Sequence, residues 1–154
     1  MKDRDFLGKK VISMADGAEV GSVKDIVFQG LELTSLLLKG DRGEGLLPFG
    51  KIGKNGPDAI MIDSYGVVDW NVGKGLAPEN RSSHDLRKLS VIDGDGHVLG
   101  HLHDFTMDAK GHVESIAVRT EGIFGIMADE TVVEGSRVRA IGADMITVDS
   151  PGKA

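Results

Sequence analysis

The sequence predicts an all-β protein made of two tandem copies of one small barrel. Glycine supplies 22 of 154 residues and is spread between short apolar runs, which indicates many tight turns. One series of turn and apolar residues occurs twice along the chain, in the same order. No long stretch keeps a helical period. Short strands at regular spacing favour small barrels, and we expect the two to form an internal pseudo-dimer.

The first half of each copy is a hairpin around an Asp-Gly turn. An offset of 79 residues aligns the Asp-Gly pairs at 16–17 and 95–96, and it also aligns Gly21 with Gly100. Asp-Gly between apolar runs is a strong signal for a hairpin turn. A glycine inside a strand pattern usually marks a bulge, a bend or a close approach of two backbones. We therefore expect Gly21 and Gly100 to play one structural role in the two copies.

The second half of each copy closes with another hairpin. An offset of 86 residues aligns Gly56 with Gly142, and the alternating apolar segments 60–62 and 146–148 follow these turns. The change of offset from 79 to 86 means that the second copy carries about seven extra residues between its matched ends. We expect the segment 46–52 to hold a single helical turn.

The repeated pattern resembles a known family, the PRC-barrel domain. The resemblance rests on apolar-x-x-Asp-Gly-x-x-apolar-Gly-x-apolar-x-Asp, followed by a Gly-x-Asp-x-apolar-x-apolar close, and it covers residues 5–70 and 84–150. It implies two compact all-β barrels used for docking to partners, and it implies no shared catalytic residues. The predicted organisation is a first PRC-barrel over 1–69, a linker over 70–83 and a second PRC-barrel over 84–154.

Trp70 is the only tryptophan and stands at the start of the predicted linker. An isolated aromatic residue usually packs, so Trp70 is expected to cap the core of the first barrel. The alternative is that it anchors an interface, because tryptophan is enriched at binding hot spots. Both readings stay open, and Trp70 is the first candidate partner-binding residue.

The extra residues of the second copy supply the other candidates. Between Val118 and Val132 the chain gains apolar side chains that the shorter loop of the first copy lacks. Such side chains either pack on the other barrel or form an exposed patch for a partner or for self-association. The candidate partner-binding residues in this loop are Ile123, Phe124, Ile126 and Met127.

Histidines suggest a second, competing function. His101 and His103 lie two residues apart on a predicted strand and therefore on one face, where two imidazoles can bind a divalent metal. The aligned residues of the first copy, Ser22 and Lys24, are polar, which places this face in solvent. Segment 93–104 resembles a calcium loop but has valine at its sixth position, where that loop needs glycine. We expect no metal site and no cofactor.

Composition excludes several classes of protein. There is no cysteine, which excludes disulfides and thiolate chemistry, and a net charge of −6 argues against nucleic-acid binding. No apolar run approaches the length of a membrane span, and none follows the charged first five residues as a signal peptide would. We expect a cytoplasmic protein that is not an enzyme. Its expected role is a non-catalytic interaction or scaffolding module that binds a protein partner or itself; the alternative is a small-ligand or metal sensor.

Overall fold

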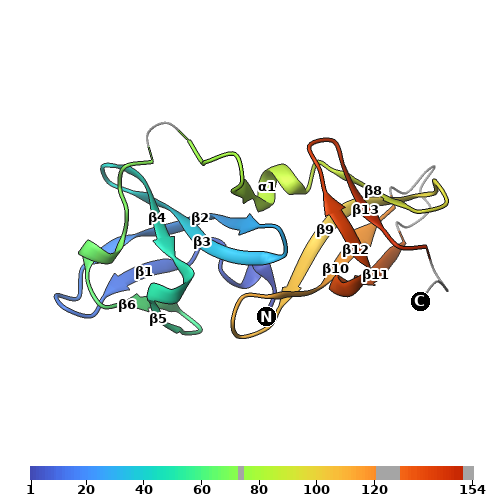
Figure 1. Cartoon of the computed structure of the whole chain (residues 1–154). Coiled ribbons are helices and arrows are strands. Elements are labelled where there is room, and N and C mark those ends of the chain that lie inside the picture. The colour runs from blue at the N-terminus through green and yellow to red at the C-terminus, as the bar shows by residue number, and fades with distance from the viewer. Residues whose placement is uncertain (73–74, 121–128, 151–154) are drawn as a thin grey trace. The chain divides into compact units, whose positions relative to one another are not determined.

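The computed structural model describes residues 1–72, 75–120 and 129–150. It divides into two compact units. The N-terminal unit is Asp3–Ser83, and the C-terminal unit is His84–Ala154 together with Met1–Lys2. Both units are built almost entirely from strands, as predicted (Figure 1). None of the described helices is both long and apolar enough to cross a membrane.

The N-terminal unit is a seven-stranded sheet with the order β4-β3-β2-β1-β6-β5, and β7 pairs with β2 beside this path. Neighbours are antiparallel, except that β1 and β6 run parallel. Its strands are β1 (Lys10–Ser13), β2 (Glu19–Gln29), β3 (Glu32–Gly40), β4 (Gly43–Pro48), β5 (Ile52–Asn55), β6 (Ala59–Ile62) and β7 (Arg81–Ser82). Three 3₁₀ turns accompany them, η1 (Asp3–Asp5), η2 (Phe49–Lys51) and η3 (Tyr65–Val67). The turn η2 confirms the single helical turn expected in segment 46–52.

The C-terminal unit repeats this arrangement with the order β11-β10-β9-β8-β13-β12. Here too one neighbouring pair, β8 with β13, is parallel. Its elements are α1 (Ser83–Leu86), β8 (Ser90–Asp93), β9 (Val98–Met107), β10 (Val113–Arg119), β11 (Glu130–Glu134), η4 (Gly135–Arg137), β12 (Val138–Ile141) and β13 (Met145–Val148). The duplicated pattern in the sequence is therefore a duplicated sheet topology.

Matched glycines have the same structural roles in both units, as predicted. Gly17 and Gly96 have φ of +69° and +84°, which the hairpin turns require. A Cβ on Gly21 would lie 2.6 Å from the carbonyl oxygen of Lys39, and one on Gly100 would lie 2.4 Å from that of Arg119. At these two points neighbouring backbones approach too closely for any side chain.

The two cores are matched almost residue for residue. Each consists of fully or nearly fully buried side chains on β1 to β4 and β6, or on β8 to β11 and β13, plus one from the segment before the first of these strands. The matched pairs are Phe6 and Leu86, Val11 and Val91, Ile26 and Phe105, Phe28 and Met107, Leu36 and Ile116, Leu38 and Val118, Leu47 and Val133, Ile60 and Ile146, and Ile62 and Val148. Burial of this apolar surface stabilises each sheet.

Each sheet also pairs with a short segment that precedes the other repeat in the sequence. In the N-terminal unit, Arg81 and Ser82 pair with Phe28 and Val27 of β2. In the C-terminal unit, Lys2 bridges Thr106 of β9, and the backbone N–H of Met107 donates to the carbonyl oxygen of Met1 at 2.7 Å. The two pairings occupy equivalent places on the long strands, because an offset of 79 aligns Val27 with Thr106.

Candidate functional site

Trp70 is positioned by the segment that follows β6 of the N-terminal sheet. The turn η3 leads into buried Val68, and Asp69 then pairs with Leu46 of the edge strand β4. The N–H of Leu46 donates to the carbonyl oxygen of Asp69 at 2.8 Å, and the N–H of Asp69 donates to that of Leu46 at 2.9 Å. This pairing covers the outer edge of β4 and presents the next residue, Trp70, to the sheet.

Two glycines make room for the indole ring. A Cβ on Gly45 would lie 2.6 Å from Cε3 of Trp70, and a Cβ on Gly40 would lie 2.8 Å from Cη2. The aligned residues of the C-terminal unit are Thr131 and Thr120, which would fill this space. The space over Gly40 and Gly45 that accommodates the indole ring is therefore a feature of the N-terminal unit.

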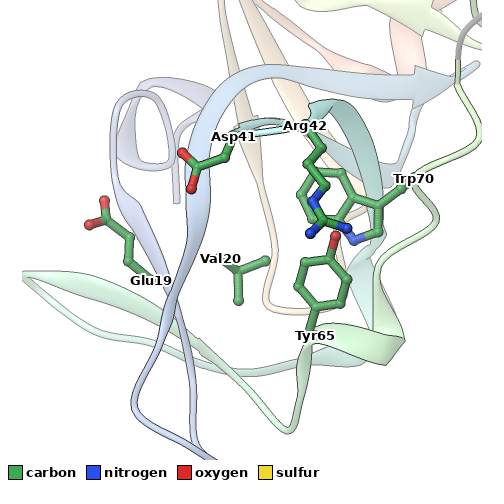
Figure 2. Close-up of a pocket in the computed structure, with 6 residues that line it drawn as sticks. All are labelled: Glu19, Val20, Asp41, Arg42, Tyr65 and Trp70. Atoms are coloured by element: carbon green, nitrogen blue, oxygen red, sulfur yellow. The ribbon is translucent and has the colours of Figure 1, made fainter.

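Trp70 also lines a hollow at the surface. Tyr65 stacks on it with ring centroids 5.1 Å apart and an angle of 18° between the planes. Tyr65 remains 47% exposed. Figure 2 shows the aromatic hollow, a cavity of about 280 Å³ lined by Glu19, Val20, Asp41, Arg42, Tyr65 and Trp70. The indole ring thus packs on glycines and forms one wall of the aromatic hollow.

Several polar groups of the aromatic hollow have no ion-pair or hydrogen-bond partner among the described residues. The side chains of Glu19, Asp41 and Arg42 are exposed, and none of them forms an ion pair in the described part of the chain. The Nε1–H of Trp70 is buried and finds no acceptor among the described residues. Two carboxylates against one guanidinium give this site a formal charge of −1. An adjoining cavity is lined by the same two acids, Glu19 and Asp41, together with Lys39.

A neighbouring cavity of about 500 Å³ shares two of these residues, Arg42 and Trp70. It adds mainly apolar side chains, those of Leu37, Val72 and Leu76. The turn between β3 and β4 thus carries cavities on both sides of Arg42. An aromatic ring, aliphatic groups and unpaired charges gathered on one surface are typical of a binding site.

The other predicted partner-binding residues, Ile123, Phe124, Ile126 and Met127, lie outside the described residues. Residues of the aromatic hollow other than Trp70 were not predicted from the sequence. One signal could have found the site: the two glycines of β3 and β4 replace residues that are both threonine in the second copy, and the chain's only Tyr and only Trp follow the same sheet.

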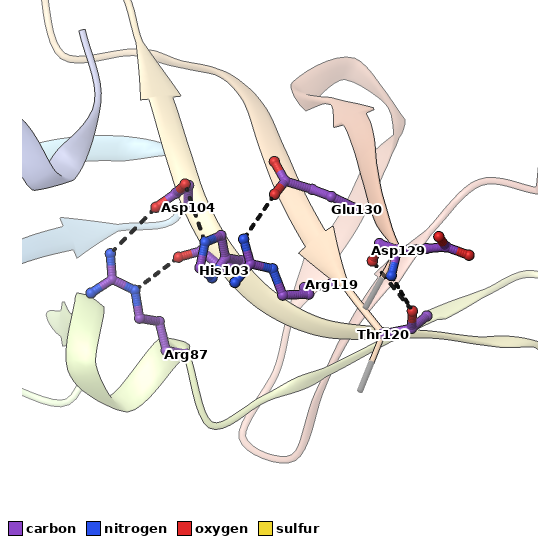
Figure 3. Close-up of polar contacts among 7 residues, drawn as sticks. All are labelled: Arg87, His103, Asp104, Arg119, Thr120, Asp129 and Glu130. Carbon is purple, nitrogen blue, oxygen red and sulfur yellow. Dashed lines mark hydrogen bonds and ion pairs between the residues drawn. The ribbon is translucent and has the colours of Figure 1, made fainter. Parts of the chain in front are cut away.

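His101 and His103, the residues of the alternative metal-binding function, differ in exposure and in neighbours. His101 is exposed, whereas the side chain of His103 is 19% exposed, with Nε2 3.6 Å from Oδ2 of Asp104. Arg87 reaches the same place: its Nε donates to the carbonyl oxygen of His103 at 3.0 Å, and its Nη2 lies 3.9 Å from Oδ1 of Asp104 (Figure 3). Within the described ranges, His101 and His103 do not belong to a group of three potential metal ligands.

Asp93, Asp95 and His97 do place three ligand atoms within 4.8 Å of one another, but the carboxylate of Asp93 already has a structural role. It accepts hydrogen bonds from the backbone N–H of Asp95 at 2.9 Å and of His97 at 3.0 Å. The bond from His97 is the main cause that holds the pKa of Asp93 below its usual range. This carboxylate fixes the turn between β8 and β9.

The matched acids Asp25 and Asp104 are both buried in the middle of long strands, β2 and β9. Oδ1 of Asp25 accepts from the hydroxyl of Ser83 at 2.6 Å and from the backbone N–H of Ile26 at 2.7 Å. Asp104 instead lies beside Arg87 and His103. The two units thus stabilise the same buried acid with different partners.

The comparison with protein families agrees with this architecture. The model of the PRC-barrel domain matches twice, over residues 1–68 and over residues 78–154. No curated protein matches the chain. The two matches confirm the resemblance inferred from the repeated turns, and the two sheets confirm the all-β fold. The chain belongs to the PRC-barrel family and carries the domain twice in tandem.

Proposed function

We propose that this protein is a non-catalytic interaction module whose N-terminal barrel binds a basic side chain of a protein partner in the aromatic hollow. The observation that carries the proposal is the half-exposed Tyr65 ring, stacked on Trp70 beside two carboxylates without ion pairs. Aromatic rings that combine an apolar body with a polar tip are enriched at protein interfaces.

The size of the aromatic hollow favours a side chain over a free metabolite. Its volume of about 280 Å³ lies at the lower limit of pockets that enclose small molecules, roughly 300 Å³. A single side chain that projects from a partner can fill it, while the rest of the partner covers the rim. The adjoining apolar side chains of Leu37, Val72 and Leu76 would extend such a contact.

Charge favours a basic side chain. A lysine or arginine head group over the exposed ring of Tyr65 gains a cation–π interaction. Glu19 and Asp41 attract the same head group, and their summed charge exceeds that of Arg42. An acidic side chain would meet two like charges.

The single tryptophan provides a direct assay, because Trp70 itself lines the site. Nα-acetyl-lysine methylamide should produce a saturable change in Trp70 fluorescence, whereas the corresponding glutamate derivative should not. Glu19→Gln combined with Asp41→Asn should weaken lysine binding by about fivefold, as expected for loss of two exposed charge interactions. Arg42→Gln should strengthen it.

Asp58→Asn is the matched control, because Asp58 is an exposed acid of the same unit outside the aromatic hollow. A partner captured from native cells by the full chain should be recovered equally well by this variant and in a smaller amount by the Glu19/Asp41 double variant. If Arg42→Gln abolishes binding, or if the glutamate derivative binds as well as the lysine derivative, the proposal is wrong.

A further inference from the structure

The two units differ at one edge of their sheets. In the N-terminal unit, Asp69 pairs with Leu46 and covers the outer edge of β4. The equivalent strand of the C-terminal unit is β11, where Val132 takes the place of Leu46, because Leu37 pairs with Leu46 as Ala117 pairs with Val132. Among the described residues, β11 pairs with β10 alone, and Val132 is 62% exposed.

The equivalence also fixes the direction of the backbone groups of Val132. The N–H and C=O of Leu46 point away from β3 toward Asp69. Hydrogen bonding alternates along an antiparallel strand, so the same groups of Val132 point away from β10. An outward N–H and C=O on an edge strand form a template for pairing with another extended segment.

Contacts with β10 and the residue after it hold β11 in an extended conformation. Arg119 forms an ion pair with Glu130 at 3.2 Å. One step further, the N–H of Thr120 donates to the carbonyl oxygen of Asp129 at 2.9 Å, and the N–H of Asp129 donates to the hydroxyl of Thr120 at 3.0 Å (Figure 3). These contacts fix the register of β11 on β10 beyond the end of both strands. A pre-organised strand loses less conformational freedom when it binds.

The outward side chains of β11 determine which side chains a pairing segment should carry. Glu130, Val132 and Glu134 alternate with Val133, which is fully buried, and so share the outer face. A second copy of β11 in antiparallel register would set Glu130 opposite Glu134, and like charges directly opposite are destabilising. A segment with basic, apolar and basic side chains would instead place an opposite-charge pair at Glu134 and an apolar pair at Val132, while Glu130, already paired with Arg119, would share its carboxylate with the second cation.

We propose that the outer edge of β11 binds an extended basic segment of a partner by strand addition, in the way that Asp69 covers β4 within the N-terminal unit. The backbone of Val132 supplies the hydrogen bonds, and Glu130 and Glu134 select lysine or arginine at the flanking positions. This surface lies on the other barrel from the aromatic hollow, and it does not depend on the function proposed there.

The test uses the full chain labelled with ¹⁵N and the acetylated, amidated peptide Lys-Thr-Val-Thr-Lys, whose symmetric sequence pairs in either direction. The peptide should give saturable NMR shifts of the amide of Val132 and its neighbours. Glu134→Gln should weaken binding by about twofold, the effect of one exposed ion pair, and it leaves the Arg119–Glu130 ion pair that orders β11 intact. The peptide Glu-Thr-Val-Thr-Glu should cause no shift.

Val132→Pro removes the outward N–H without a ladder bond to β10, so it should abolish binding while the melting temperature changes little. Glu134→Lys leaves the backbone intact and should also weaken binding if the proline variant does not fold. The Glu19/Asp41 double variant should bind the peptide like the parent chain, which separates this test from that of the aromatic hollow. Shifts absent from β11, or equal shifts with the glutamate peptide, overturn the proposal. So does a concentration-dependent dimer that Val132→Pro dissociates.

Discussion

The two barrels share a topology and a core but differ where each sheet meets solvent. In the N-terminal unit, the segment after β6 returns to pair with Leu46 and lays Trp70 over Gly40 and Gly45. In the C-terminal unit, threonines replace both glycines and Val132 is exposed. The apolar residues that close each core are duplicated, whereas these residues at the sheet edge differ between the copies. Among the described residues, the clearest structural difference between the two units therefore lies at the edges formed by β4 and β11.

The largest expected effect tests the shared part. Gly100 combines φ of +140° with a Cβ position 2.4 Å from a carbonyl oxygen, whereas Gly21 has only the close approach, at 2.6 Å. Gly100→Ala should lower the free energy of unfolding by about 4 kcal/mol, the sum of backbone strain and overpacking, and Gly21→Ala by about 2 kcal/mol. Chemical denaturation measures both. Equal losses would show that the backbone angle of Gly100 has no separate effect.

The next test exchanges a residue between the barrels. Gly45→Thr introduces the residue of the C-terminal unit under Trp70, where a Cβ would lie 2.6 Å from the ring. It should cost about 2 kcal/mol and shift the emission of the displaced Trp70 toward the red. The reverse change, Thr131→Gly, is made at an exposed strand position and should cost about 0.5–1 kcal/mol. Unchanged emission from Gly45→Thr would contradict the placement described for Trp70.

The buried acids give a smaller contrast. Ser83→Ala removes the hydroxyl that donates to Asp25 at 2.6 Å, so the carboxylate loses a buried hydrogen bond worth about 1–3 kcal/mol. Arg87→Met should cost the C-terminal unit about 1 kcal/mol, because Nη2 lies 3.9 Å from Asp104 and is partly screened by solvent. Thermal unfolding of the two variants measures this order. A larger loss from Arg87→Met would mean that Asp104 depends on this cation more than the distance indicates.

The smallest effect concerns pH. Because the pKa of Asp93 is lowered in the folded state, its contribution to stability is present above the pKa of the unfolded chain, about 3.9, and is lost as pH falls through the folded value. Asp93→Asn keeps an acceptor oxygen but does not titrate in this range. Its melting temperature should therefore fall less than that of the parent chain between about pH 4 and about pH 2. Parallel curves would exclude Asp93 as a source of acid sensitivity.

Local chemistry made the repeated core predictable. Asp-Gly turns, strand glycines such as Gly21 and alternating apolar residues act within a few positions of the chain, so their pattern reveals the hairpins. The pairing of Asp69 with Leu46 joins residues far apart in the sequence, and no periodicity marks it. The aromatic hollow depends on that pairing. For this reason, the sequence offers Trp70 as a candidate partner-binding residue but does not point to the residues around it.

The segments that precede the two repeats, Met1–Lys2 and Arg81–Ser82, link the two halves of the chain. Met1–Lys2 belong to the unit of the second repeat, and Arg81–Ser82 belong to the unit of the first. Each half of the gene therefore encodes one strand-like piece of the sheet that the other half specifies. Loss of either half by deletion would leave the remaining barrel with an incomplete sheet.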